Sequence, residues 1–240
     1  MIKGTVALPV WNSVKIAWLC MESLCNQQRP NNPWELIICE ETQANYLGKS
    51  FFLGYQDRLK LVGCEKITYM DVKEKTPLSM KWVKMSYIAA PTSQYFILCA
   101  ADNYYHPYML RDVEKNMPPA EWFLTTQGYF YDFNLQKLIR YQYNGNIGLQ
   151  MAAKTSLVQR LPLEIKNRAV DGWFFKNLHP AKIVRDPSDH WKFTLCTNGL
   201  NNISKSRHIF FTNPHGAFQG TDEKLENIVP EVIYKLLIKL

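Results

Sequence analysis

The fold of this chain is decided by residues 95–107, which read YFILCAADNYYHP. An apolar run from Tyr95 to Cys99 is followed by two alanines and the carboxylate of Asp102. An unbroken apolar run is typical of a strand that is buried on both faces, as in a parallel sheet covered by helices. Pro107 cannot donate to a strand ladder, so the strand must end before it. Asp102 therefore lies where a buried strand emerges, at the edge where open α/β sheets bind ligands.

Three roles are open to Asp102 from this stretch alone. Its carboxylate can bind a metal ion, accept a hydrogen bond from a sugar hydroxyl, or cap the helix that follows. The capping role is purely structural, and the stretch by itself does not exclude it.

The composition indicates one folded domain of ordinary size. The chain has 240 residues, of which 47% are hydrophobic and 20% are charged, so a sizeable core can form. The 28 Lys and Arg residues exceed the 21 Asp and Glu residues and give a net charge of +7. This excess favours anionic partners such as nucleotides, phosphates or acidic membrane surfaces. No long basic block stands out, so nucleic-acid binding is not expected.

The cysteines and termini predict a soluble, cytoplasmic protein. None of the six cysteines forms a CxxC pair, so they are interpreted as buried, reduced thiols. The five histidines show no HxxxH or HxH spacing, so a zinc centre is not expected. The N-terminus lacks a signal-peptide pattern, and no apolar run approaches the roughly 20 residues that a membrane span needs. Peripheral contact of the C-terminal helix with an acidic membrane remains open.

The first 107 residues alternate between strand and helix patterns. Their order, βαβαβαβ, predicts a mainly parallel sheet flanked by helices, with right-handed crossovers. We expect strands over 5–10, 34–39, 66–70 and 95–101, with helices over 15–27, over 44–56 and from Pro77. Beyond residue 107 we expect helices over 109–117, 155–160 and 226–240, and strands over 121–126, 129–131, 138–143, 182–184 and 191–195.

Three motifs lie at the carboxyl ends of the first, second and fourth predicted strands. They are Pro9-Val10-Trp11-Asn12, the pair Glu40-Glu41, and Asp102-Asn103. The tips of parallel strands converge on one edge of a sheet. These groups suit a nucleotide. The aromatic ring can stack on the base, and a carboxylate of the glutamate pair can accept a hydrogen bond from the base or ribose. The carboxylate of Asp102 can bind a cation that also contacts the diphosphate. No GxGxxG or GxxxxGK[ST] motif is present.

The order of these motifs resembles the nucleotide-sugar-dependent glycosyltransferases of the GT-A fold, family 2 in particular. Residues 9–12 are similar to the end of that family's first strand, and the Glu40-Glu41 pair to the acidic pair after its second strand. Residues 100–107 resemble its DxD-type motif, and residues 170–175, VDGWFF, resemble the motif that carries its catalytic base. The resemblance spans about residues 4 to 180.

The resemblance implies an α/β protein of GT-A type. Residues 1–107 would bind the nucleotide-sugar, and residues 108–240 would form the acceptor-binding and catalytic half of the same domain. The reaction would be inverting, hexosyltransferase-type transfer from a UDP-sugar to a hydroxyl of a glycan or another acceptor, as in polysaccharide biosynthesis, with Mn²⁺ or Mg²⁺ as cofactor. The implied residues are Asp171 as catalytic base, Asp102 as metal ligand, and Pro9, Trp11, Asn12, Glu41, Lys81 and Arg207 as donor-binding residues.

Several of these residues also have plain structural interpretations. Asp171 could be a helix cap, Trp11 a core residue and Lys81 a solvated surface lysine. Ala100 and Ala101 stand where the family usually has a further acid, which favours the alternative of a catalytically silent nucleotide- or glycan-binding module. A sugar nucleotidyltransferase is a second alternative, but the glycine-rich basic loop of that class is absent from residues 9–12.

Overall fold

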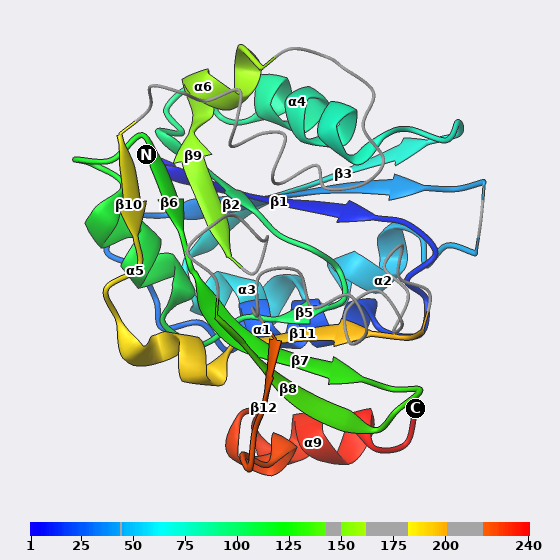
Figure 1. Cartoon of the computed structure of the whole chain (residues 1–240). Coiled ribbons are helices and arrows are strands. Elements are labelled where there is room, and N and C mark those ends of the chain that lie inside the picture. The colour runs from blue at the N-terminus through cyan, green and yellow to red at the C-terminus, as the bar shows by residue number, and fades with distance from the viewer. Residues whose placement is uncertain (44, 143–149, 162–181, 201–217) are drawn as a thin grey trace.

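The computed structural model describes residues 1–43, 45–142, 150–161, 182–200 and 218–240. Within these ranges the chain forms two β-sheets, with helices on both faces of the larger one (Figure 1). The larger, main sheet has the strand order β10-β6-β9-β4-β1-β2-β3. Its strands are β1 (Gly4–Val10), β2 (Trp34–Glu41), β3 (Cys64–Val72), β4 (Tyr95–Leu98), β6 (Trp122–Leu124), β9 (Met151–Lys154) and β10 (Ile183–Arg185).

The second sheet has the order β12-β8-β7-β11-β5. Its strands are β5 (Asn103–Tyr104), β7 (Gln127–Asp132), β8 (Lys137–Gln142), β11 (Leu195–Asn198) and β12 (Phe218–Gly220). The α-helices are α1 (Ala17–Cys25), α2 (Lys49–Leu53), α3 (Gln56–Leu61), α4 (Leu78–Ile88), α5 (Met109–Asn116), α6 (Thr155–Gln159) and α9 (Glu231–Leu237). Two 3₁₀ helices are η1 (Asp189–Phe193) and η3 (Leu225–Asn227).

The main sheet is mainly parallel, as the sequence predicts. Strand β1 pairs in parallel with β2 and with β4, so that Gly4 lies opposite both Trp34 and Tyr95. Strand β2 continues the parallel pairing to β3. On the other side β9 is antiparallel to both β4 and β6. The α/β class and the mainly parallel sheet are therefore confirmed, with β9 as the antiparallel member.

Side chains on the central strands alternate between two separate cores. In β1, Val6 and Leu8 belong to the core shared with α1, α3 and α5, whereas Ala7 belongs to the core shared with α4 and α6. Figure 1 shows α1, α3 and α5 below the main sheet and α4 and α6 above it. Successive residues of a strand face opposite sides of a sheet. The apolar runs are unbroken because both faces are covered.

A third core joins the second sheet to the C-terminus. Tyr104 of β5, Tyr129 of β7 and Leu195 of β11 pack with Ile233 and Leu237 of α9. Figure 1 places α9 beneath this sheet. No helix of the described residues has the length and apolarity needed to span a bilayer.

The cysteines are buried and none is paired in a disulfide, as the sequence predicts. Burial raises the pKa of Cys25 and Cys39 to about 11 and that of Cys64 and Cys99 to about 12. Thiols in such surroundings stay protonated at neutral pH and behave as small apolar side chains.

Three predicted elements are wrong in detail. The strand expected over 191–195 is helical in η1, whose first turn is capped by the Ser188 side chain accepting from the His190 amide. The helix expected over 44–56 is instead the short pair α2 and α3, which are separated at Gly54 and Tyr55. The helix expected over 226–240 is divided into η3 and α9 by Pro230, which can precede a helix but not lie inside one.

One prediction concerns the contact between β1 and β4. A Cβ atom at Gly4 would lie 2.2 Å from Cε2 of the buried Tyr95 ring on the neighbouring strand. Gly4→Ala should therefore force the ring aside and lower the free energy of unfolding by about 1–3 kcal/mol in urea denaturation. Gly220→Ala is the matched control, because no atom lies within 4 Å of a Cβ there. Equal stability of the two variants would contradict this close approach.

Candidate active site

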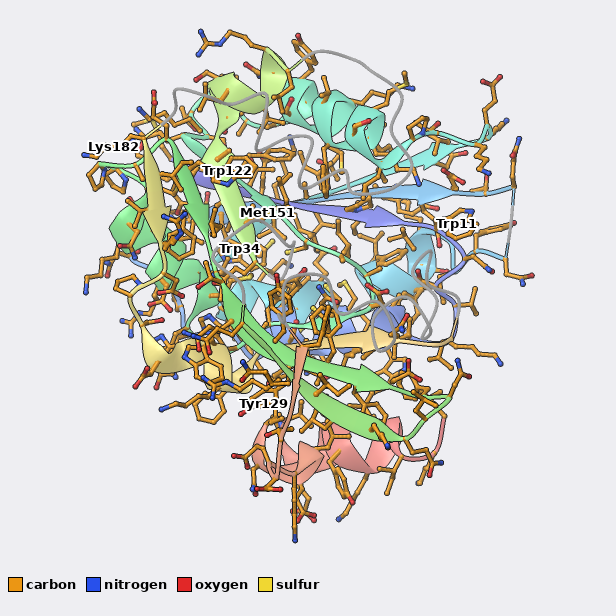
Figure 2. The ribbon with its side chains drawn as sticks, in the orientation of Figure 1. Trp11, Trp34, Trp122, Tyr129, Met151 and Lys182 are labelled. Atoms are coloured by element: carbon orange, nitrogen blue, oxygen red, sulfur yellow. The ribbon has the colours of Figure 1, made fainter. Side chains whose placement is uncertain are left out.

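Polar and aromatic side chains gather where β1, β2 and β4 end. Because these neighbouring strands are parallel, their carboxyl ends lie at one edge of the main sheet. Trp11 follows β1 and lies beyond the end of that strand in Figure 2. Glu40 and Glu41 are the last two residues of β2, and Asp102 follows β4. The edge thus carries the groups that the sequence places there.

The segment after β1 leaves an indole ring accessible to ligands. Pairing of β1 with β4 ends at Ala7, whereas pairing with β2 continues past Pro9. Trp11 is 38% exposed, and its carbonyl accepts from the Ser13 hydroxyl at 2.9 Å. Asn12 has a φ of 48°, a left-handed conformation that asparagine tolerates better than most residues. Trp11 is therefore not a core residue.

Glu40 has a structural role. Its two carboxylate oxygens accept from the amides of Leu47 and Gly48, at 2.8 and 3.0 Å, and one of them also accepts from the Tyr69 hydroxyl at 2.8 Å. Burial and this hydrogen bond raise the pKa of Tyr69 well above its usual value. Glu40 therefore fixes the segment between β2 and α2 and uses its oxygens to do so.

Glu41 and Lys81 form a buried ion pair. Lys81 lies in α4, and its Nζ is 2.8 Å from Oε1 of Glu41, with each side chain only 4% exposed. The amide of Thr76 donates to the same oxygen at 2.9 Å. The expectation of a solvated Lys81 is therefore wrong. The structure brings these two predicted donor-binding residues together, and removing either one would leave a buried charge without its partner.

Asp102 is half-buried in the turn between β4 and β5. The hydroxyl of Thr197 in β11 donates to its main-chain carbonyl at 2.7 Å. Its negative charge adds to burial in raising the pKa of Cys196. Asp102 therefore lies at the junction of the two sheets. The remaining predicted residues, Asp171 and Arg207, lie outside the described residues.

A second polar cluster, which the sequence reasoning missed, lies where α5 meets η1. It consists of His106, Asp112 of α5 and His190 of η1, whose ligand atoms lie within 4.8 Å of one another. Oδ2 of Asp112 is 2.6 Å from Nδ1 of His190 and 3.8 Å from Nε2 of His106. Spacing along the chain could not reveal this group, because its members come from three separate elements.

This group could hold a metal ion, but both ring nitrogens of its buried residue, His106, already form hydrogen bonds. The amide of Tyr108 donates to Nδ1 of His106 at 3.2 Å, so the ring proton is on Nε2. Nε2 lies 2.9 Å from Oε1 of Gln150 and donates to it. Burial, aided by the neighbouring His190, lowers the pKa of His106 to about 3. A metal ion at Nε2 would have to displace this proton.

The buried ring of His106 predicts a pH-dependent stability. Above pH 6.5 the ring is neutral in both the folded and unfolded chain, and below it only the unfolded chain gains a proton until about pH 3. Stability should therefore fall as the pH drops, by about 2 kcal/mol from this ring between pH 7 and 5. His106→Asn should lack this part of the fall in urea denaturation. An equal fall in both proteins would contradict a neutral buried His106.

Comparisons by sequence identify no relatives. No protein-family model matches the chain, and no curated protein matches it in sequence.

Comparisons of structure show the fold. TarS 1–349 from S. aureus in complex with UDP-GlcNAc has a TM-score of 0.62 at 14% identity, over 84% of this chain and 60% of TarS 1–349. The mannosyltransferase PcManGT from Pyrobaculum calidifontis in complex with GDP-Man and Mn²⁺ has a TM-score of 0.59 at 12% identity, over 84% of this chain and 58% of PcManGT.

The chain spans only part of the length of these proteins. In a further structure of TarS, the match covers 37% of the TarS chain. At such identities the similarity shows the fold alone. The chain has the GT-A-like fold of glycosyltransferases.

Proposed function

We propose that this protein transfers a sugar from a nucleotide-diphosphate sugar, most simply a UDP-sugar, to a hydroxyl of a glycan or another acceptor. The observation that carries the proposal is the gathering of Trp11, Glu41 and Asp102 at one edge of the main sheet. The fold supports it, because glycosyltransferases with this fold have been seen with UDP-GlcNAc or with GDP-Man and Mn²⁺. In this proposal residues 1–107 bind the donor and residues 108–240 bind the acceptor.

The exposed ring of Trp11 stacks on the base, with Pro9 and Asn12 forming the wall beside it. Glu41 accepts from the base or ribose. Glu41 and Lys81 form an ion pair in the structure. A ligand that contacts either side chain must therefore join this ion pair or replace one of its partners. Lys81 then turns toward the diphosphate, which Arg207 grips through two parallel hydrogen bonds.

Asp102 holds Mn²⁺ or Mg²⁺ in this proposal. Ala100 and Ala101 carry no side-chain oxygen, and no group of three metal-binding side chains among the described residues includes Asp102. Asp102 would supply one carboxylate ligand, and oxygens of the diphosphate or of water would supply the others. A bound divalent cation neutralises charge that develops on the diphosphate.

Asp171 takes the proton of the acceptor hydroxyl. The freed oxygen forms a bond with the anomeric carbon as the bond from that carbon to the diphosphate breaks, and the configuration inverts. A sugar hydroxyl is a poor nucleophile until a nearby base removes its proton. Cations around the diphosphate stabilise its growing negative charge.

The absence of side-chain oxygens at residues 100 and 101 favours one other function. A protein with this fold and a single acid could bind a nucleotide or glycan without turnover. That alternative keeps nucleotide binding and loses transfer, so measuring the two separately distinguishes them.

The first prediction from this proposal concerns the metal. UDP should raise the melting temperature, more strongly with Mn²⁺ present, because a ligand of the folded state stabilises it by mass action. Asp102→Asn should remove the added effect of Mn²⁺. Asp57→Asn is a control, since the side chain of Asp57 is 97% exposed on α3. An Mn²⁺ effect of unchanged size in Asp102→Asn would contradict the metal assignment.

The second prediction concerns the base. Asp171→Asn should bind UDP and Mn²⁺ like the wild type. It should release UDP from UDP-GlcNAc, UDP-glucose or UDP-galactose, with water accepting the sugar, at least about 10²-fold more slowly, because general-base assistance is worth 10²–10⁴-fold. Coupled detection of UDP measures the rate. Unchanged release would remove Asp171 as the base, and binding without any release by the wild type would support the silent alternative.

A further inference from the structure

The turn that carries Asp102 belongs to both sheets. Strand β4 ends at Leu98 in the main sheet, and β5 begins at Asn103 in the second. Asn103 pairs with Cys196 of β11. The turn is closed by a backbone hydrogen bond from the Asn103 amide to the Ala100 carbonyl at 3.4 Å. This contact is long for a backbone hydrogen bond.

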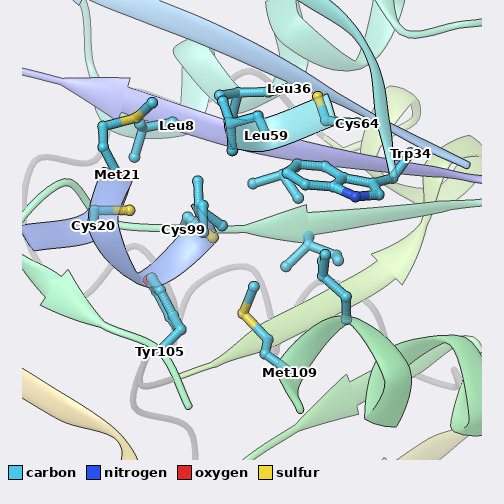
Figure 3. Close-up of a cluster of buried hydrophobic side chains, with 14 of the residues drawn as sticks. Leu8, Cys20, Met21, Trp34, Leu36, Leu59, Cys64, Cys99, Tyr105 and Met109 are labelled. Carbon is cyan, nitrogen blue, oxygen red and sulfur yellow. The ribbon is translucent and has the colours of Figure 1, made fainter. Parts of the chain in front are cut away.

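The hydroxyl of Tyr105 fills the inside of this turn. It accepts from the Ala100 amide at 2.7 Å and from Nδ2 of Asn103 at 3.4 Å. Tyr105 is fully buried, and Figure 3 shows its ring in the core that also contains Cys99. One side chain therefore contacts the residues on both sides of Asp102, from below the main sheet.

Thr197 holds the same turn from the other side. This residue of β11 is 4% exposed, and its hydroxyl donates to the carbonyl of Asp102 at 2.7 Å. The contact ties the backbone of Asp102 to the second sheet. Tyr105 thus holds the turn from the core below the main sheet, and Thr197 holds it from the second sheet.

We propose that Tyr105 and Thr197 are positioning residues for Asp102, and that Thr197 links the acceptor half of the chain to the metal site. This inference rests on the proposed function. A metal site with several acids tolerates displacement of one of them, whereas a single carboxylate must be held where the diphosphate can share its cation. The hydroxyls of Tyr105 and Thr197 perform that task through the backbone.

The chain provides a matched pair of tyrosines for the test. Tyr104 is also buried, but it faces the third core, and its hydroxyl has no hydrogen-bond partner among the described residues. Tyr105→Phe and Tyr104→Phe therefore remove the same atom from neighbouring buried positions. Only the first substitution removes hydrogen bonds to the Asp102 turn.

Two readouts separate positioning from folding. Tyr105→Phe should speed hydrogen exchange of the Ala100 amide about tenfold and should raise about tenfold the Mn²⁺ concentration needed for the UDP-dependent thermal shift. Tyr104→Phe should leave both at wild-type values. Equal exchange and equal Mn²⁺ requirement in the two variants would overturn the proposal for Tyr105.

Thr197 is tested by loss and rescue of its hydroxyl. Thr197→Val keeps the shape of the side chain but lacks the hydroxyl donor, so it should raise the Mn²⁺ concentration needed for the UDP-dependent thermal shift. Thr197→Ser keeps the donor and should return that concentration to the wild-type value. Failure of serine to rescue, or a wild-type Mn²⁺ requirement in Thr197→Val, would overturn the role of Thr197.

The exchange measurement keeps this inference separate from the proposed function. If wild type shows no response to UDP and Mn²⁺, the proposed function fails. The role of Tyr105 in holding the turn is then still tested by hydrogen exchange of the Ala100 amide. Faster exchange in Tyr105→Phe but not in Tyr104→Phe supports that role. Unchanged exchange of the Ala100 amide in Tyr105→Phe overturns the positioning role of Tyr105, whether or not UDP binds.

Discussion

The parallel pairing of β1 with both β2 and β4 is the constraint on which the rest of the structure depends. It makes β1 fully buried, so that helices must cover both faces of the main sheet. It also brings the ends of three strands that are distant in the chain to one edge. Each end delivers a different kind of side chain, namely an indole ring, a carboxylate pair and a single acid. The chemistry proposed for the protein is thus a consequence of strand order.

The sequence allowed the fold to be predicted more completely than the site. Unbroken apolar runs such as residues 95–99 report burial on two faces, and the strand–helix alternation before residue 107 has few topological solutions. The late part of the chain was harder, because short segments such as 191–195 carry alternating and helical patterns equally well. There the capping by Ser188 and the packing of Trp191 decide the conformation, and neither is visible in a local pattern.

Within the site, sequence position predicted location but not partners. Glu41 ends β2 and Lys81 lies in α4, as predicted, but the two side chains are buried and form an ion pair with each other. The Thr76 amide also donates to Glu41. The cluster of His106, Asp112 and His190 escaped notice because tertiary packing alone assembles it. Tyr105 looked like one aromatic residue among several, and only its hydrogen bonds distinguish it from Tyr104.

The buried cysteines allow local unfolding of the protein to be detected by their chemical modification. Burial raises the pKa of every one of the six thiols, so none presents a reactive thiolate at neutral pH. They are spread over both main-sheet cores and the second sheet. Modification by a thiol reagent therefore reads out which core has come apart. A single cysteine added at the surface would be labelled in the folded protein without competition from the natural ones.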